Sequence, residues 1–104
     1  MFERLKRSED FDKVFRKGKK SYGKHLMMLF IPSKETKIGF SVSKKNGKAV
    51  VRNRIKRLLR AAVRETYPLI KGNYYIVILP RVEDFYGLEG FSSDLKKIIV
   101  KEKL

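Results

Sequence analysis

The sequence lacks cysteine altogether and contains a single histidine. Without cysteine, neither a disulfide nor a thiolate metal site can form. Long uncharged apolar runs are also missing: the longest, 26–31 and 74–79, have the length of strands and are far too short to cross a bilayer. The N-terminus is charged within its first four residues, and no apolar signal segment follows. We therefore expect a cytoplasmic protein without a membrane partner.

Residue types that usually carry catalysis are scarce as well. His25 lies in or beside an expected strand without a partner that the sequence reveals, so a surface or packing role is the simplest interpretation. The 11 carboxylates are scattered over helix starts and turns, whereas a two-metal nuclease site needs several of them to converge. Glycine-rich phosphate-binding loops are absent. We predict no catalytic residue and no metal ligand in this chain.

Acidic residues are missing from the whole segment between Thr36 and Glu65, which carries ten basic residues. Surface helices usually interleave acids with bases, because opposite charges one turn apart stabilise the helix. Bases alone repel one another unless an anion binds to them. The net charge of +15 extends this excess to the whole chain. The expected partner therefore carries many fixed negative charges, as a nucleic acid backbone does.

The rest of the composition is that of one folded domain. Hydrophobic residues make up 42% and aromatic residues 12% of the chain, which excludes a disordered basic tail. A first helix is predicted to begin at Ser8, whose hydroxyl suits an N-cap, and to stop at Gly18. Phe11, Val14 and Phe15 are spaced to share one face of this helix.

Strand patterns follow at 20–22, 25–31, 37–43 and 74–79. The third of these alternates apolar residues with small ones, so each kind occupies its own face of the sheet. The small residues are Gly39, Ser41 and Ser43. Such small side chains would leave their face open to a molecule laid across it.

A longer helix is predicted to begin near Ala49 and to end by Tyr67, because Pro68 disfavours helical geometry at the residue before it. Its apolar residues lie within an arc of about 140°. They are Val51, Ile55, Leu58, Leu59, Ala62 and Val63. The opposite face is polar and cationic. It carries Asn53, Lys56, Arg57, Arg60 and Arg64, with Arg52 and Arg54 at its margins.

A last amphipathic helix is expected from about residue 92 or 93, whereas 82–90 shows no clear pattern. The order is therefore helix, three strands, helix, strand, helix. It predicts a single α+β domain over 1–104, an α-β sandwich in which helices cover one face of a mixed sheet of about four strands.

Three features of this arrangement suit nucleic acid. Arginine dominates the long helix, and its planar fork grips phosphate in two places and stacks on bases. Asn46 and Gly47, just before the helix, are expected to let the backbone approach a phosphate near the positive helix end. Phe11 and Phe15 would lie beside the open sheet face, where aromatic rings hold unstacked single-stranded nucleic acid.

The segment Lys44-Lys45-x-Gly-Lys-Ala-Val-x-Arg52-Asn53-Arg54-Ile55-Lys56-Arg57-x-x-Arg60 closely resembles the signature of the bacterial ribonuclease P protein subunit. The similarity continues in the first helix, from Arg4 to Gly18, and in the strand that runs from Gly39 into the signature. Nearly the whole chain is covered, except 82–90. The signature is long and ungapped, so its specificity is high.

The resemblance implies a protein that pairs with a catalytic RNA, which cleaves the 5′ leader from precursor tRNA with magnesium held mainly by the RNA and the substrate. It implies no obligate protein partner. It also implies a sandwich shared with a ribosomal-protein domain (the second domain of protein S5), with a left-handed β-α-β crossover that breaks the usual right-handed rule.

The resemblance further implies two sets of binding residues. Those facing the catalytic RNA would be Lys44, Lys48, Arg52, Asn53, Arg54, Lys56, Arg57 and Arg60. Those binding the single-stranded leader, in a cleft between the first helix and the sheet, would be Phe11, Phe15, Ser41, Ser43 and Lys45. One departure stands at Leu29, near which relatives often carry an aromatic residue.

Two alternatives stay open. Charge and fold class would equally allow a structural ribosomal protein or a general RNA chaperone, although neither needs an aromatic cleft. A duplex-DNA reader would place the basic helix in the major groove. That mode requires side chains such as Asn or Gln among the arginines, and only Asn53 qualifies.

Overall fold

The computed structural model describes residues 2–104 and forms a five-stranded sheet with three α-helices and two short 3₁₀ turns over that range. The elements are β1 (Glu3–Arg4), α1 (Ser8–Lys17), β2 (Lys19–Tyr22), β3 (Leu26–Pro32), β4 (Lys37–Phe40), η1 (Lys44–Asn46), α2 (Ala49–Thr66), η2 (Tyr67–Leu69), β5 (Tyr74–Pro80) and α3 (Leu88–Glu102). The predicted order of helices and strands is confirmed, and β1 is added before α1.

The sheet is mixed, as predicted, and its strand order is β1-β4-β5-β3-β2. Strands β1, β4 and β5 run parallel, whereas β3 pairs antiparallel with both β5 and β2. Strand β1 contributes only two residue pairs, Glu3 with Lys37 and Arg4 with Ile38. A strand of two residues carries no alternating pattern, which is why the sequence did not reveal it.

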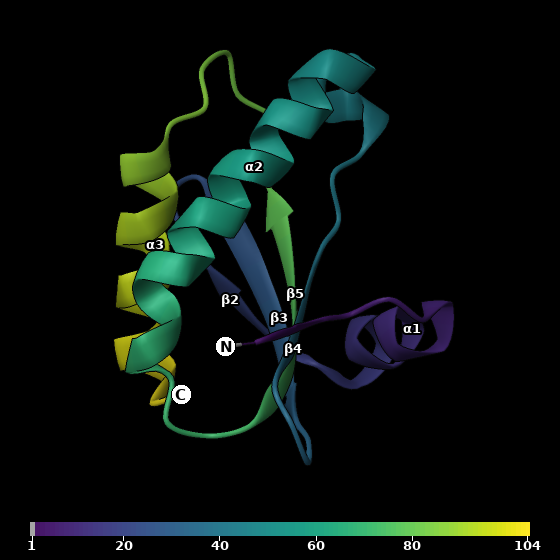
Figure 1. The fold of residues 1–104 in the computed structure, drawn as a ribbon, viewed down its shortest axis with the longest axis vertical. Coiled ribbons are helices and arrows are strands. Elements are labelled where there is room, and N and C mark those ends of the chain that lie inside the picture. The colour runs from purple at the N-terminus through teal and green to yellow at the C-terminus, as the bar shows by residue number, and fades with distance from the viewer. Residues whose placement is uncertain (1) are drawn as a thin grey trace.

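Helices cover both faces of the sheet, which corrects the prediction that they all lie on one face. Helix α1 packs on one side and α2 with α3 on the other (Figure 1). The physical reason lies in β3 and β5, whose residues are buried on both faces. Leu29 and Val77 form the core under α1, while Met28 and Ile78 belong to the larger core under α2 and α3.

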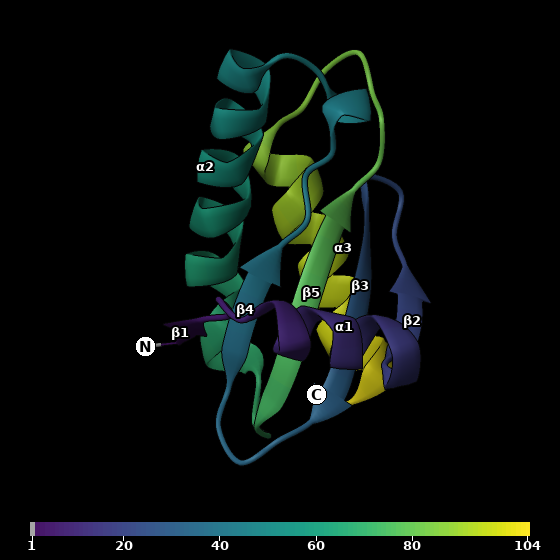
Figure 2. The same ribbon diagram turned by 90° about the vertical axis from the view of Figure 1, so that its right-hand side faces the viewer.

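The connection from β4 through α2 to β5 is the left-handed crossover that the resemblance implied. Figure 2 views the sheet from the α1 side, with β4 and β5 both pointing upward and β5 to the right of β4. Helix α2 joins them across the far face of the sheet. The chain thus passes behind the sheet and returns to the right of β4, which makes the crossover left-handed, whereas most such crossovers are right-handed.

Three element ends differ from the predicted ones. Helix α1 includes Ser8 in its first turn, and the Asp10 and Phe11 amides bond to the Arg7 carbonyl oxygen, so Arg7 stands at the N-cap. Its side chain makes no capping hydrogen bond, because a guanidinium has no acceptor. Gly18 does end the helix, in an extended conformation. Helix α3 begins at Leu88, earlier than predicted: Ser92, which resembles a cap in the sequence, is buried and donates its hydroxyl hydrogen to Glu65.

Strand β4 ends at Phe40, although the alternating pattern continues to residue 43. The Ser41 amide still donates to the Ile78 carbonyl oxygen at 2.9 Å. Ser43 then turns away, because its amide donates to Asn46 Oδ1 at 3.0 Å and opens the turn η1. The ladder with β5 therefore stops where the turn before α2 begins.

Candidate nucleic-acid interface

The apolar stripe of α2 faces the sheet and α3, as predicted, so the polar face of the helix points outward. Ile55, Leu59, Ala62 and Val63 are buried. Six cations stand on the rest of the helix: Arg52, Arg54, Lys56, Arg57, Arg60 and Arg64. Within residues 2–104 none of them has a carboxylate oxygen within 4.0 Å. Arg54, Arg57 and Arg64 are exposed, and Arg52, Lys56 and Arg60 are half-buried. The positive charge of this face is thus left for an anion to neutralise.

The turn η1 positions three further lysines at the start of α2. Asn46 is its anchor: the buried side chain donates to the Arg81 carbonyl oxygen at 3.2 Å and to the Tyr86 hydroxyl at 3.1 Å. The Asn46 side chain thus faces the protein interior, and the expectation that the backbone of Asn46 and Gly47 approaches a phosphate stays a prediction. The exposed lysines around this anchor are Lys44, Lys45 and Lys48.

Gly47 completes the turn in a conformation that other residues rarely adopt. Its φ is +136°, and a Cβ atom there would lie 2.9 Å from Val51 Cγ1. Glycine therefore sets the angle at which the chain enters α2. The direction of the cationic helix depends on this one position.

Phe11 of α1 lies against the open position on β4. A Cβ atom on Gly39 would come within 2.5 Å of Phe11 Cζ, so the absence of a side chain lets the ring approach the strand. A hollow of about 150 Å³, here called the Phe11 hollow, opens beside it. Its lining residues are Arg4, Leu5, Phe11, Gly39, Phe40, Lys56 and Arg60. The fold thus brings one predicted leader residue together with two cations of α2.

The other predicted leader residues do not line this hollow. Phe15 follows one turn later on α1 and keeps 41% of its surface exposed. Ser41 is half-buried beyond the end of β4, and Ser43 and Lys45 are exposed at η1. Leu29 is only 1% exposed in the core beneath α1, so its side chain offers no surface to a ligand here.

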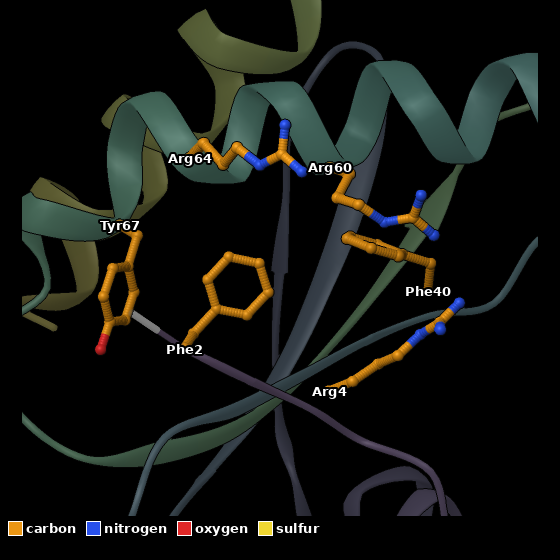
Figure 3. A pocket seen from close by; sticks show the side chains of 6 residues that line it. All are labelled: Phe2, Arg4, Phe40, Arg60, Arg64 and Tyr67. Atoms are coloured by element: carbon orange, nitrogen blue, oxygen red, sulfur yellow. The ribbon is translucent and has the colours of Figure 1, made fainter.

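A second hollow adjoins the first on the α2 side of strand β4. It has a volume of about 370 Å³ and is here called the Phe2 pocket. Three aromatic residues and three arginines line it: Phe2, Phe40, Tyr67, Arg4, Arg60 and Arg64 (Figure 3). Arg4, Phe40 and Arg60 also line the Phe11 hollow, which makes the two hollows neighbours. This pocket could not be predicted from the sequence, because it depends on β1 pairing with β4.

Titratable groups outside this surface serve the packing of the fold. Glu83 lies 2.8 Å from Nδ1 of His25, and the buried Asp94 carboxylate accepts the His25 and Leu26 amides. Across residues 2–104, no three histidine or carboxylate side chains gather as metal ligands would. Over the same range, no helix combines the length and the apolar character that crossing a membrane requires.

Fold and surface together define a class: a small mixed α+β sandwich with a left-handed crossover and an unpaired cationic helix beside aromatic hollows. The family model described as Ribonuclease P matches residues 1–102. The chain therefore belongs to the ribonuclease P protein family, as the resemblance of its signature indicated.

Individual relatives agree with this assignment. The chain is 38% identical over 104 residues to the ribonuclease P protein component of Bacillus velezensis, covering 97% of this chain and 90% of that protein. It is 37% identical over 111 residues to that of Microcystis aeruginosa, covering 97% and 91%. Among solved structures, the Staphylococcus aureus RNase P protein superposes with a TM-score of 0.82 at 27% identity, over 99% of this chain and 97% of that one. The Thermotoga maritima protein gives 0.83 at 26% identity, over 95% and 96%.

Proposed function

We propose that this protein is the RNA-binding subunit of a ribonucleoprotein endoribonuclease that removes the 5′ leader from precursor tRNA. The observation that carries the proposal is the cationic face of α2, unpaired along its whole length and adjoining the hollow that holds Phe11. Such a surface suits two RNA strands that must approach each other, because it neutralises the phosphates of both.

The first strand is the catalytic RNA, which binds the polar face of α2 and the lysines of η1. The exposed fork of Arg54 and that of Arg57 grip phosphate oxygens, and the adjacent Asn53 adds a neutral hydrogen-bonding group. Gly47 and the buried Asn46 support this interface by fixing the entry angle of the helix.

The second strand is the single-stranded leader, which lies over α1 and the end of β4. Phe15 offers an exposed ring to an unstacked base, while Lys56 and Arg60 offset phosphates at the Phe11 hollow. Ser41, Ser43 and Lys45 extend this path toward η1 as polar contacts. The proposed complex acts in the cytoplasm and needs no further protein.

The chemical step belongs to the RNA in this proposal. Magnesium prefers several oxygen ligands in octahedral geometry, and the carboxylates of residues 2–104 do not converge to supply them. The residues of this chain therefore bind and orient the two RNAs, and magnesium is held mainly by the catalytic RNA and the substrate.

A reconstitution assay tests the proposal. Purified protein is mixed with a bacterial ribonuclease P RNA and precursor tRNA at low magnesium, and release of the leader is measured. We expect no cleavage by protein alone and faster cleavage by the complex than by the RNA alone. Cleavage by RNA-free protein, or no effect of protein on the RNA, contradicts the proposal.

The alternative, a structural ribosomal protein or general RNA chaperone, predicts a different binding pattern. A general RNA binder holds precursor and mature tRNA equally, because both present the same phosphate-rich body. A leader-binding subunit prefers the precursor. The exposed ring of Phe15 beside a cationic surface favours the second outcome.

A further inference from the structure

The Phe2 pocket combines aromatic rings with guanidinium groups. Three aromatic residues are half-buried in its walls, so part of each ring remains exposed. The three arginines come from two separate elements, Arg4 from β1 and Arg60 and Arg64 from α2. Within the part of the chain that the structure describes, none of the three has a carboxylate within 4.0 Å.

We infer that the Phe2 pocket binds one unstacked nucleotide of the leader strand, next to those held at the Phe11 hollow. The inference rests on the proposed function and extends it to the α2 side of strand β4. The base lies against an aromatic ring, and its phosphate takes a place between guanidinium groups. Aromatic rings bind bases of any sequence, and the arginine fork matches a phosphate.

Size and ring geometry agree with such a ligand. The volume of about 370 Å³ lies within the range of small-molecule sites, roughly 300–1,000 Å³. The rings of Phe2 and Tyr67 have centroids 5.4 Å apart and are tilted by 57°. They do not stack face to face on each other, so their mutual contact does not cover a face of both rings.

The wall that the two hollows share would guide the RNA strand from one hollow to the other. Figure 3 shows Arg60 descending from α2 and Arg4 rising from β1 toward Phe40. Both arginines line both hollows. A strand that passes from Phe11 by way of Phe40, at the end of β4, would therefore place the phosphate between two successive nucleotides near Arg4 and Arg60.

A packing role for the rings alone does not account for the arginines. Phe2 and Tyr67 do contact the main core, but that contact does not require arginines beside the rings. Three guanidinium groups around one hollow repel one another, and an anion between them removes that repulsion. The combination therefore points to a ligand with a flat ring system and a negative charge.

A length series of single-stranded RNA tests the inference. Oligonucleotides from about 4 to about 16 nucleotides, the range of single-strand sites, are titrated into the protein. Affinity should rise once the strand is long enough to reach the Phe2 pocket. In Phe2→Leu, which keeps an apolar side chain, and in Arg64→Gln, that gain should shrink by about 5-fold or more. The shortest strands should bind wild type and variants alike.

Matched controls lie on the opposite edge of the sheet. Lys20→Gln removes one exposed cation and Tyr22→Leu one exposed ring, both from β2. Neither should change the gain with length. Thermal unfolding of each variant confirms the fold, and Arg64→Gln keeps the test decisive if Phe2→Leu unfolds, since Arg64 is exposed.

Three outcomes overturn the inference: an unchanged gain with length in both pocket variants, an equal loss in the controls, or a loss confined to binding of the catalytic RNA alone. The last would assign the pocket to an unpaired nucleotide of that RNA. Failure of the proposed function is separate and visible in the wild type, which would then show no preference for precursor over mature tRNA.

Discussion

Phe15 and Val14 are neighbours on α1 but differ in burial. Val14 stabilises the fold, whereas Phe15 is exposed enough to contact a ligand. Val14 is fully buried in the core under the helix, whereas Phe15 is 41% exposed. In the sequence both fit the apolar face, so periodicity alone does not tell them apart. The geometry of the helix on the sheet decides which of them is available to a ligand.

Phe15→Ala should weaken binding of precursor tRNA by roughly 5- to 150-fold, because base–aromatic stacking is worth about 1–3 kcal/mol. Mature tRNA lacks the leader, so its affinity should barely change. Fluorescence titrations with both RNAs measure the difference. Tyr22→Ala, which removes another exposed ring from the edge strand β2, is the control and should leave both affinities unchanged. Equal losses for both tRNAs in a folded Phe15→Ala protein would rule out a leader contact here.

Asn46 and Asn53 carry the same amide side chain but also differ in burial. Asn46 is buried and holds the Arg81 carbonyl and the Tyr86 hydroxyl, whereas Asn53 is exposed on α2. Asn46→Ala should lower the free energy of unfolding by about 1–3 kcal/mol, since buried polar partners lose their hydrogen bonds. Asn53→Ala should stay within about 0.5 kcal/mol of wild type. Chemical denaturation measures both, and a cost that is equal for the two variants would contradict the anchor role of Asn46.

At the scale of the element, α2 is a helix whose two faces have separate tasks. Its apolar stripe is fixed by the core, so its charges can change without loss of the fold. Arg52→Ala, Arg54→Ala and Arg57→Ala combined should leave the protein folded and weaken its binding to the catalytic RNA. Each phosphate contact that is lost should flatten the slope of log K against log salt by roughly 0.7–0.9.

The matched control for this triple variant lies on α3. Lys96, Lys97 and Lys101 are exposed there, and their replacement by Ala removes the same charge from another face. A binding surface localised on α2 requires a much smaller change of slope in the α3 variant. If both triple variants change the slope equally, net charge explains the binding and the α2 face has no special role.

Some features of the helices and strands can be predicted from the sequence, and others cannot. The boundaries of α2 are readable, because the apolar period is long and Pro68 follows. The β4 alternation correctly separates Ile38 from Gly39. The position of α1 on its own face, strand β1 and the Phe2 pocket depend on contacts between distant segments, which local periodicity does not record. The handedness of the crossover came only from the resemblance, since general rules favour the opposite hand.

At the scale of the whole molecule, most carboxylates of residues 2–104 form no ion pair with the many cations, and one ion pair with a buried carboxylate ties α3 to the sheet. Glu102 of α3 lies 2.9 Å from the Lys19 ammonium of β2, and its side chain is only 8% exposed. The hydrogen bond from Lys19 lowers the pKa of the Glu102 carboxyl below its ordinary value. The interaction links the last helix to the edge strand that is far from α2.

The lowered pKa makes the stability of the fold depend on acid pH in a defined direction. The folded state holds the Glu102 proton less tightly than the unfolded state does, so the pair stabilises the fold above the ordinary carboxyl pKa. That contribution is lost as the pH falls through the lowered pKa of the folded state. Glu102→Gln removes the titrating group, so the difference in unfolding free energy between wild type and variant should be largest near neutral pH and shrink in acid.

Urea denaturation of both proteins across the acid range measures this difference. The other carboxylates titrate in both proteins and cancel in the subtraction. Lys19→Gln supplies the control, because the Lys19 side chain is largely exposed and its loss removes the cause of the lowered pKa. In that background, Glu102→Gln should have a smaller effect with a weaker dependence on pH. A difference between wild type and Glu102→Gln that is the same at every pH would show that Glu102 contributes by packing and not by its charge.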